Sequence, residues 1–385
     1  MKTIYLDNNA TTLLDPVVAK QLSSCYQSGY MNPASQHTAG RRARQVLEDA
    51  REELASLLGA GIKQPGADQV VFTSGATEAN NLAMLGLALD PHGHALVSRL
   101  EHPSVVEPAR ILESRGVDVE WVPVLANGII DVPFIQDRIR ENTRIVTIML
   151  GNNQTGIIQP VREVVELCRN LGVPVHCDAA QAAGKIHINF RDLGVSTLSV
   201  AAHKFHGPRG IGALVVRNEV AIRPLLSGGS QQFGLRPGTE SVCLALGMTT
   251  ALLRCCDSSA DRENSLRDAR DKFERMLCEQ LPAAVVIGGD QPRLPQTSCI
   301  AFPPHDRQAV VMALDLAGIA CSTGSACTSG SSEPSPVLLE MGLEKSLVES
   351  AVRFSFGADN DHSDADQAAQ RISSVINSLG HQKQA

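Results

Sequence analysis

The sequence predicts an α/β protein in which a large, mostly parallel sheet of seven strands carries helices on both faces and a smaller α/β domain follows. Three observations point to this class. Short, β-branched apolar runs alternate with helical patterns over the larger, N-terminal part of the chain. The alternation weakens in a polar stretch, residues 255–264, and shorter strand candidates come after it. A length of 385 residues also suits two domains.

Seven apolar runs are too short for helices and are predicted as the strands of the large sheet. They are residues 70–73, 95–97, 119–124, 145–150, 173–177, 197–200 and 211–216. Helical patterns lie between many of them. Residues 41–58 have apolar side chains at helical spacing, which places them on one face of a predicted helix. A second predicted helix, residues 161–171, is followed by Gly172 as its stop signal. Alternating strands and helices imply a parallel sheet that is covered on both sides.

The polar stretch is predicted as the boundary of the large domain. A helix is expected from about residue 265 to 280, followed by strands at residues 285–287, 297–301, 319–321 and 352–356 and by a final amphipathic helix that contains Ile372 and Ile376. We therefore expect a large domain of residues 14–257 and a small domain of residues 1–13 and 258–385, with a frayed tail after Gly380.

Composition excludes several classes of function. Lys and Arg number 34 against 41 Asp and Glu, the net charge is -7 and aromatic residues make up 3%, which argues against a nucleic-acid partner. No apolar stretch approaches the ~20 residues that cross a bilayer, and no signal peptide is evident. The 10 cysteines lack the paired spacing of disulfide or zinc scaffolds. We expect a cytoplasmic protein with reduced thiols and without a membrane partner or a stable metal site.

The first candidate site element is residues 70–78, a strand that runs through Gly75 into a helix. The free N–H groups at the start of that helix would bind an anion, and Thr77 would add a hydroxyl group. A plain capped turn between strand and helix is the alternative, because Ser and Thr favour helix starts in any case.

Two further strands end in chemically useful residues. Asp178 follows a buried strand, at the sheet edge where parallel sheets bind ligands, and Gln181 lies three residues on. Asp178 would hold a proton on a ring nitrogen; the alternative is a helix N-cap. Lys204 follows another strand and precedes a glycine-rich turn, a setting that suits a Schiff-base lysine better than a surface charge.

An anion site, a carboxylate for a ring nitrogen and a Schiff-base lysine are together what pyridoxal phosphate needs. At this point the chain resembles the cysteine desulfurases of the NifS/IscS kind, which have the aminotransferase-like fold type I of pyridoxal phosphate enzymes. The stretches that carry the resemblance run nearly from end to end and are residues 5–12, 32–33, 37, 40–41, 72–81, 101–102, 152–153, 156, 178–185, 202–212, 234–240, 324–329, 333–334 and 353–355. The last group points to the class with a long cysteine loop, here residues 321–335.

The resemblance implies roles for individual residues. Lys204 would form the Schiff base with pyridoxal 5'-phosphate, Asp178 would pair with the ring nitrogen, Gln181 would contact the ring hydroxyl, and His102 would stack on the ring and move protons. The remaining expected contacts are with the phosphate, from Ala76, Thr77, His203 and, across a homodimer, Thr239 of a second subunit, and with the substrate carboxylate, from Asn153 and Arg353.

Two positions depart from the family pattern. Ala201 stands where the family commonly has a Ser that binds the phosphate, and Ser199 or a water is expected to replace that contact. Gln154 stands where many relatives have Glu, which changes a charge near the cofactor but no assigned role.

Cys327 is the expected nucleophile, and its surroundings agree. Glycines and five serines between residues 322 and 332 make a polar loop that is a poor place to bury a thiol. Cys321 ends an apolar run and is predicted to be a core residue. Cys327 is also the one residue expected to act, transiently, as an iron-sulfur ligand.

The resemblance implies a cysteine desulfurase that converts L-cysteine to L-alanine and leaves a persulfide on Cys327, for donation to an iron-sulfur scaffold or another sulfur acceptor. A selenocysteine lyase or a cysteine lyase on the same fold is the near alternative, and a catalytically silent scaffold protein is the distant one. No G-x-G-x-x-G follows a strand at the head of a βαβ unit and no P-loop is present, so nucleotide chemistry is not expected.

Overall fold

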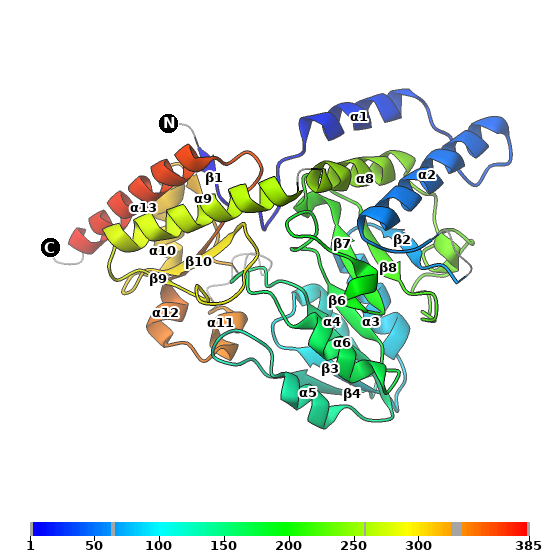
Figure 1. Cartoon of the computed structure of the whole chain (residues 1–385), viewed down its shortest axis with the longest axis horizontal. Helices are drawn as coiled ribbons and strands as arrows, with labels where there is room; N and C mark the ends of the chain where they lie inside the picture. Colours follow the sequence, from blue (N-terminus) through cyan, green and yellow to red (C-terminus); the bar gives the residue numbers. More distant parts are fainter. Residues whose placement is uncertain (1–2, 63–65, 258, 325–332, 383–385) are drawn as a thin grey trace.

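The computed structural model describes residues 3–62, 66–257, 259–324 and 333–382 (Figure 1). Its largest sheet has seven strands in the order β2-β8-β7-β6-β5-β3-β4. Strand β8 is antiparallel to both of its neighbours, and the other pairs are parallel. The strands are β2 (Gln69–Thr73), β3 (His94–Ser98), β4 (Asp118–Val122), β5 (Thr143–Met149), β6 (Val175–Asp178), β7 (Thr197–Ala201) and β8 (Gly212–Val216). All seven predicted strands are confirmed, and β8 explains why the sheet is only mostly parallel.

Helices cover both faces of this sheet because its strands are apolar on both sides. On β3, Leu96 packs in the largest core cluster, whereas Ala95 and Val97 pack with Met84 and Val105 on the opposite face. The helices of this part are α1 (Pro16–Gln27), α2 (Thr38–Leu57), α3 (Ala76–Ala88), α4 (Pro103–Ser114), α5 (Val132–Arg138), α6 (Val161–Arg169), α7 (Phe190–Leu193) and α8 (Val242–Cys256), with short 3-10 turns η1 (Ala202–Lys204) and η2 (Gln232–Gly234).

A second core lies around a three-stranded antiparallel sheet in which β10 (Thr297–Ala301) runs between β9 (Val285–Val286) and β12 (Ala351–Ser355). The rings of Phe354 and Phe356 both meet Phe273 edge-on, with centroids 5.2 and 5.4 Å away. Strand β1 (Ile4–Tyr5) pairs in parallel with β11 (Ile319–Ala320), which brings the N-terminal segment into this part of the chain. Its helices are α9 (Ser259–Gln280), α10 (Arg307–Leu316), α11 (Pro336–Glu340), α12 (Lys345–Ser350) and α13 (His362–Gln382).

Two predicted boundaries are wrong. Helix α9 begins at Ser259 rather than near residue 265, because the polar stretch, with exposed Asp261 and Asn264, is part of a helix whose buried side is formed further on by Leu266, Phe273 and Leu277. Helix α13 continues through Gln382, beyond the expected end at Gly380, and it lies beside α9 (Figure 1). The division into residues 14–257 and residues 1–13 with 258–385 stays a prediction.

The parallel strands bring their carboxyl ends to one edge of the large sheet. Asp178 ends β6 and Ala201 ends β7, three residues before Lys204. None of the helices in the described ranges is long and apolar enough to cross a membrane.

Candidate functional site

A cavity of about 510 Å³ lies at this edge of the sheet and brings most of the predicted site residues together. The predicted residues that line it are Ala76, Thr77, His102, Asn153, Asp178, Gln181, Ala201, His203 and Lys204. They come from the ends of different strands, and the N-terminal segment adds Ala10 and Thr11. Residues far apart in the sequence therefore meet in one space of the size that holds a small ligand.

The turn between β2 and α3 leaves a helix start open toward the cavity. Gly75 is the N-cap of α3, and no side chain caps the helix there. Ala76 and Thr77 form the first turn and line the cavity. Backbone N–H groups without a cap and the positive end of the helix dipole favour an anion at this place. The alternative of a plain capped turn is therefore wrong.

The carboxylate of Asp178 is buried and held from two sides. Its Oδ1 accepts a hydrogen bond from the backbone N–H of Ala180 at 2.9 Å, and its Oδ2 accepts one from Nδ2 of Asn80 at 2.8 Å. Turns rather than a helix follow Asp178 directly, so the alternative of a helix N-cap is wrong. An oriented carboxylate in this position can pair with a protonated ring nitrogen.

Glu101 is a buried acid beside this carboxylate that the sequence reasoning did not single out. Burial and, next, the negative charge of Asp178 raise the pKa of Glu101 to about 8. Its Oε1 accepts a hydrogen bond from the backbone N–H of Met149 at 2.6 Å. At neutral pH Glu101 is thus mostly protonated.

Lys204 reaches into the cavity from η1. Its Nζ donates hydrogen bonds to the carbonyl oxygens of Asn9 and Ala10, the second over 2.9 Å. His203 lies next to it, and Nδ1 of His203 is 3.2 Å from Oγ1 of Thr11. Burial, followed by the charges of Lys204 and Arg209, lowers the pKa of His203 to about 4, so this ring is neutral at pH 7. The N-terminal segment thus holds the amine at one side of the cavity.

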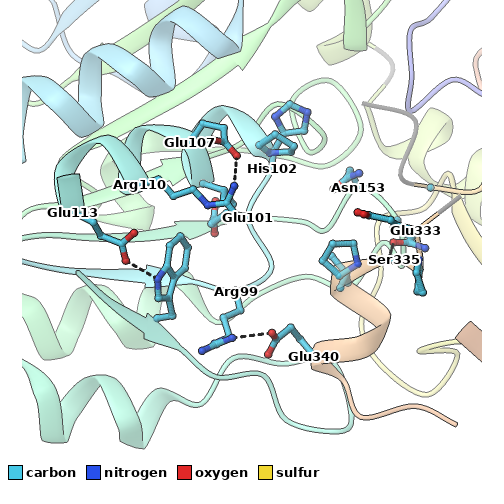
Figure 2. Close-up of a pocket in the computed structure, with 18 residues that line it drawn as sticks. Arg99, Glu101, His102, Glu107, Arg110, Glu113, Asn153, Glu333, Ser335 and Glu340 are labelled. Carbon is cyan, nitrogen blue, oxygen red and sulfur yellow. Dashed lines mark hydrogen bonds and ion pairs between the residues drawn. The ribbon is translucent and has the colours of Figure 1, made fainter. Parts of the chain in front are cut away.

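His102 lies between this cavity and a second one of about 650 Å³. It is the N-cap of α4, where its Nδ1 accepts a hydrogen bond from the backbone N–H of Ser104. The second cavity shares His102 and Asn153 with the first and is lined by both flanks of the cysteine loop, Gly324 and Glu333. Figure 2 shows His102 and Asn153 among the residues that line this second cavity.

Arg353 lies beside the cavity but does not line it. Its guanidinium group donates to the carbonyl oxygen of Asn153 at 3.1 Å and forms an ion pair with Asp7 at 2.7 Å. Its Nε has no hydrogen-bond partner in the described part of the chain. The role of Arg353 and of the neighbouring Asn153, which lines the cavity, in binding a substrate carboxylate stays a prediction.

Thr239 and Cys327 are the remaining predicted site residues. Thr239 is exposed and does not line the cavity, and its expected contact with a second subunit stays a prediction. Cys327 falls outside the described residues. Cys321 is half-buried against the second core, and burial raises the pKa of its thiol to about 12, in agreement with the predicted core position.

The chain is similar to a known protein family. The family model described as aminotransferase class-V matches residues 4–368. The chain belongs to this family. The expected resemblance is thereby confirmed at the level of the family.

The relatives of the chain have consistent names, cysteine desulfurase or NifS-like protein. The chain is 37% identical over 378 residues to a cysteine desulfurase from Enterobacter agglomerans, covering 98% of the chain and 93% of that protein. It is 39% identical to a cysteine desulfurase from Sinorhizobium fredii, with 98% of both chains covered. A solved NifS-like protein superimposes with a TM-score of 0.88 at 31% identity, covering 97% of this chain and 99% of the other.

The chain differs from the family pattern at Ala201 and Gln154, and the structure shows what each position does. Ala201 lines the cavity, but Oγ of Ser199 donates to Oδ1 of Asn80 and Ser199 does not line the cavity. The expectation that Ser199 replaces the missing contact is therefore wrong. Gln154 is buried, and its side chain accepts from Oγ of Ser335 and donates to the carbonyl oxygen of Thr323 at 3.4 Å, which ties together both flanks of the cysteine loop.

Proposed function

We propose that this member of the aminotransferase class-V family is a cysteine desulfurase that uses pyridoxal 5'-phosphate to convert L-cysteine to L-alanine and to place the released sulfur on Cys327 as a persulfide. The observation that carries the proposal is the single cavity of about 510 Å³ that Asp178, His102 and Lys204 line together with the open start of α3. The relatives that are named cysteine desulfurases support the same reaction.

The residues present fit the proposed cofactor. The uncapped N–H groups at Ala76 and Thr77 suit its phosphate, with His203 as a further donor and Ala201 beside them without a hydroxyl group. Asp178 would hold the ring nitrogen, and Gln181 would donate to the ring hydroxyl. We infer a homodimer in which Thr239 of a second subunit completes the phosphate site. When bound, pyridoxal phosphate supplies an electron sink for negative charge at the substrate Cα.

The chain's own groups then divide the work. Arg353 and Asn153 bind the substrate carboxylate and so fix which Cα bond faces the amine of Lys204. The Lys204 amine takes the Cα proton, and its position follows from the carbonyl oxygens of Asn9 and Ala10 that hold its Nζ. Asp178 keeps a proton on the ring nitrogen, and His102 carries a proton to or from the substrate.

Sulfur transfer requires the Cys327 thiolate. It attacks the sulfur of the substrate, so that an S–S bond forms while the Cβ–S bond breaks. The electron pair of the broken bond stays with the substrate carbon, which is protonated on the way to L-alanine. The persulfide is then passed to a second thiol, for which we propose an iron-sulfur scaffold or another sulfur-acceptor protein of the cytoplasm.

The decisive experiment supplies L-cysteine, without reductant, to purified protein loaded with pyridoxal phosphate. Peptide mass spectrometry locates the added sulfur, while alanine and pyruvate are assayed in the same sample. Sulfur on Cys327 with a matching amount of alanine is the expected result. Pyruvate with unmodified Cys327 would mean a cysteine lyase, and no product would favour a silent scaffold. A parallel sample with L-selenocysteine tests the remaining alternative, since preference for selenocysteine would mean a selenocysteine lyase.

A further inference from the structure

Asn80 is a fully buried polar residue of α3 that the assigned roles do not use. Its side chain has two N–H donors and an oxygen with two lone pairs, and all four are engaged. Nδ2 donates to Oδ2 of Asp178 and to Oγ of Ser104, both over 2.8 Å. Oδ1 accepts from Nε2 of His176 at 3.0 Å and from Oγ of Ser199. No bonding position of this amide is left over.

The orientation of the amide follows from its partners. An ionised carboxylate only accepts hydrogen bonds, so the atom of Asn80 that faces Asp178 is the NH2 group. The oxygen must then face His176, whose Nδ1 is 2.8 Å from Oγ1 of Thr197. Burial lowers the pKa of His176 to about 4, so this imidazole is neutral, with its one hydrogen on Nε2, pointing at Asn80. The carboxylate therefore fixes the orientation of the amide, and a neutral His176 with its hydrogen on Nε2 satisfies the amide oxygen.

This orientation decides the hydrogen bond between Ser104 and His102. Oγ of Ser104 accepts from Asn80, which leaves its own hydrogen for Nδ1 of His102 at 2.7 Å. The backbone N–H of Ser104 points at the same Nδ1 over 3.1 Å. Two donors on one side of the ring make Nδ1 an acceptor. The hydrogen of the neutral imidazole must then be on Nε2.

We propose that Asn80 is a positioning residue that joins the Asp178 carboxylate and the His102 ring in one hydrogen-bonded unit and fixes Nε2 as the nitrogen of His102 that exchanges a proton with the substrate. The assignment of the tautomer stands on the hydrogen bonds alone. The catalytic consequence rests on the proposed function. In that reaction the neutral His102 ring presents Nε2–H as a donor. The Asn80 amide aligns this ring through Ser104 and also aligns the Asp178 carboxylate.

The tautomer is tested on the purified, cofactor-loaded full chain by nitrogen NMR. The protein has 11 histidines, so the ring of His102 is assigned by the signal that is lost in His102→Gln. We expect an unprotonated Nδ1 and a protonated Nε2 in the neutral ring. In Ser104→Ala the backbone N–H still donates to Nδ1, so the tautomer should persist while the Nδ1 chemical shift moves because one of its two donors is lost, and Ser104→Thr should restore the wild-type shift. A proton on Nδ1 in the wild type would overturn the proposal. This readout needs no turnover, so it remains valid if the proposed reaction is wrong.

The catalytic part is tested by the kinetics of alanine formation. Asn80→Ala and Ser104→Ala should each lower kcat by about ten-fold or more and change KM by less than about three-fold, because the lost bonds orient groups rather than bind substrate. The kcat of the double variant should be at most about three-fold lower than that of Asn80→Ala, because both residues act through one chain of hydrogen bonds. Asn81→Ala is the matched control, because Asn81 donates only to the carbonyl oxygen of Thr77 in the described structure.

Outcomes of the two tests can be told apart. Equal kcat in Asn80→Ala, Ser104→Ala and Asn81→Ala would overturn the positioning role even if the wild type is a desulfurase. If Asn80→Ala does not fold, Ser104→Ala decides alone, since it leaves the bond between Asn80 and Asp178 in place. A wild type that forms no alanine but shows the expected tautomer would refute the proposed function and retain the assignment of His102.

Discussion

Asp7 and Arg353 are 346 positions apart in the chain, and their side chains form an ion pair of 2.7 Å. The Arg353 side chain is 3% exposed and that of Asp7 21%, so the pair is largely buried, beside the cavity rather than on the surface. Asp7 holds the guanidinium group in place and also offsets its charge. A substrate carboxylate that binds Arg353 must share it with this anion.

Asp7→Asn separates these two effects, because Asn keeps an acceptor oxygen for the guanidinium group and removes the negative charge. We expect KM for L-cysteine to fall by about three-fold or more, with little change in kcat, and the melting temperature to fall because Arg353 loses its counter-ion. Steady-state kinetics and thermal unfolding measure both. Arg353→Lys is the companion variant and should raise KM; a rise of KM in Asp7→Asn as well would show that Asp7 acts only as a support.

Lys204→Ala should abolish the absorption band of the Schiff base between pyridoxal phosphate and the protein, while the cofactor remains bound through the contacts at α3 and Asp178. The absorption spectrum and reduction with borohydride followed by peptide mass spectrometry check this. Lys20→Ala, at an exposed lysine of α1, is the control and should keep the band. An unchanged spectrum in Lys204→Ala would move the Schiff base to another amine.

Ala201→Ser should strengthen the hold on the cofactor phosphate. Ala201 lines the cavity and is 1% exposed, and Ser199 behind it is engaged with Asn80, so no hydroxyl group of β7 is available at present. A hydrogen bond to a charged phosphate should slow dissociation of the cofactor by about ten-fold. The loss of cofactor absorbance during dilution into a trapping agent measures this rate. Equal rates would mean that water already supplies the contact.

Lys185 predicts a specific dependence of stability on pH. Burial, with smaller effects of neighbouring charges, lowers its pKa from 10.5 to about 7, and its Nζ has no partner among the described residues. Between about pH 7 and 10.5 the unfolded chain therefore binds a proton that the folded chain lacks, and the free energy of unfolding rises with pH.

Lys185→Met should remove this rise and raise the stability at pH 7, because no amine is then buried. Denaturant titrations at pH 7 and pH 9 compare the two proteins, with Lys20→Met as a control that keeps the wild-type slope. The same slope in Lys185→Met would assign the pH dependence to another group.

Cys327→Ser should keep the cofactor spectrum and lose transfer of sulfur to an acceptor thiol, since a hydroxyl group cannot form the persulfide. Cys321→Ser is the matched control, six residues away, and should retain transfer because the raised pKa of the buried Cys321 thiol, about 12, keeps it protonated. Radiolabelled cysteine and gel analysis of the acceptor measure the transfer. Transfer that persists in Cys327→Ser but stops in Cys321→Ser would reverse the assignment.

The local pattern predicted the strands and the strand-end residues because these depend on short stretches of sequence. Asp178 and Lys204 follow apolar runs that end at one edge of a parallel sheet, and this rule needs no tertiary detail. Asn80 had no comparable signal, since it is one of two adjacent asparagines on a helix and only the folded sheet brings it to Asp178. The pairing of Ile4 with Ile319 could not be predicted either, because strands of two residues have no periodicity.

The order of the large sheet determines how late the site is completed during synthesis. Strand β2 lies at the sheet edge and pairs only with β8 within the described chain, although β2 is the first of the seven strands to leave the ribosome and β8 is the last. The turn at Gly75 also contacts Gly212 closely. A nascent chain that ends before residue 216 therefore lacks a complete β8, the strand that supports β2 and the start of α3. A cofactor that needs this turn can be bound only by a chain whose large sheet is already complete.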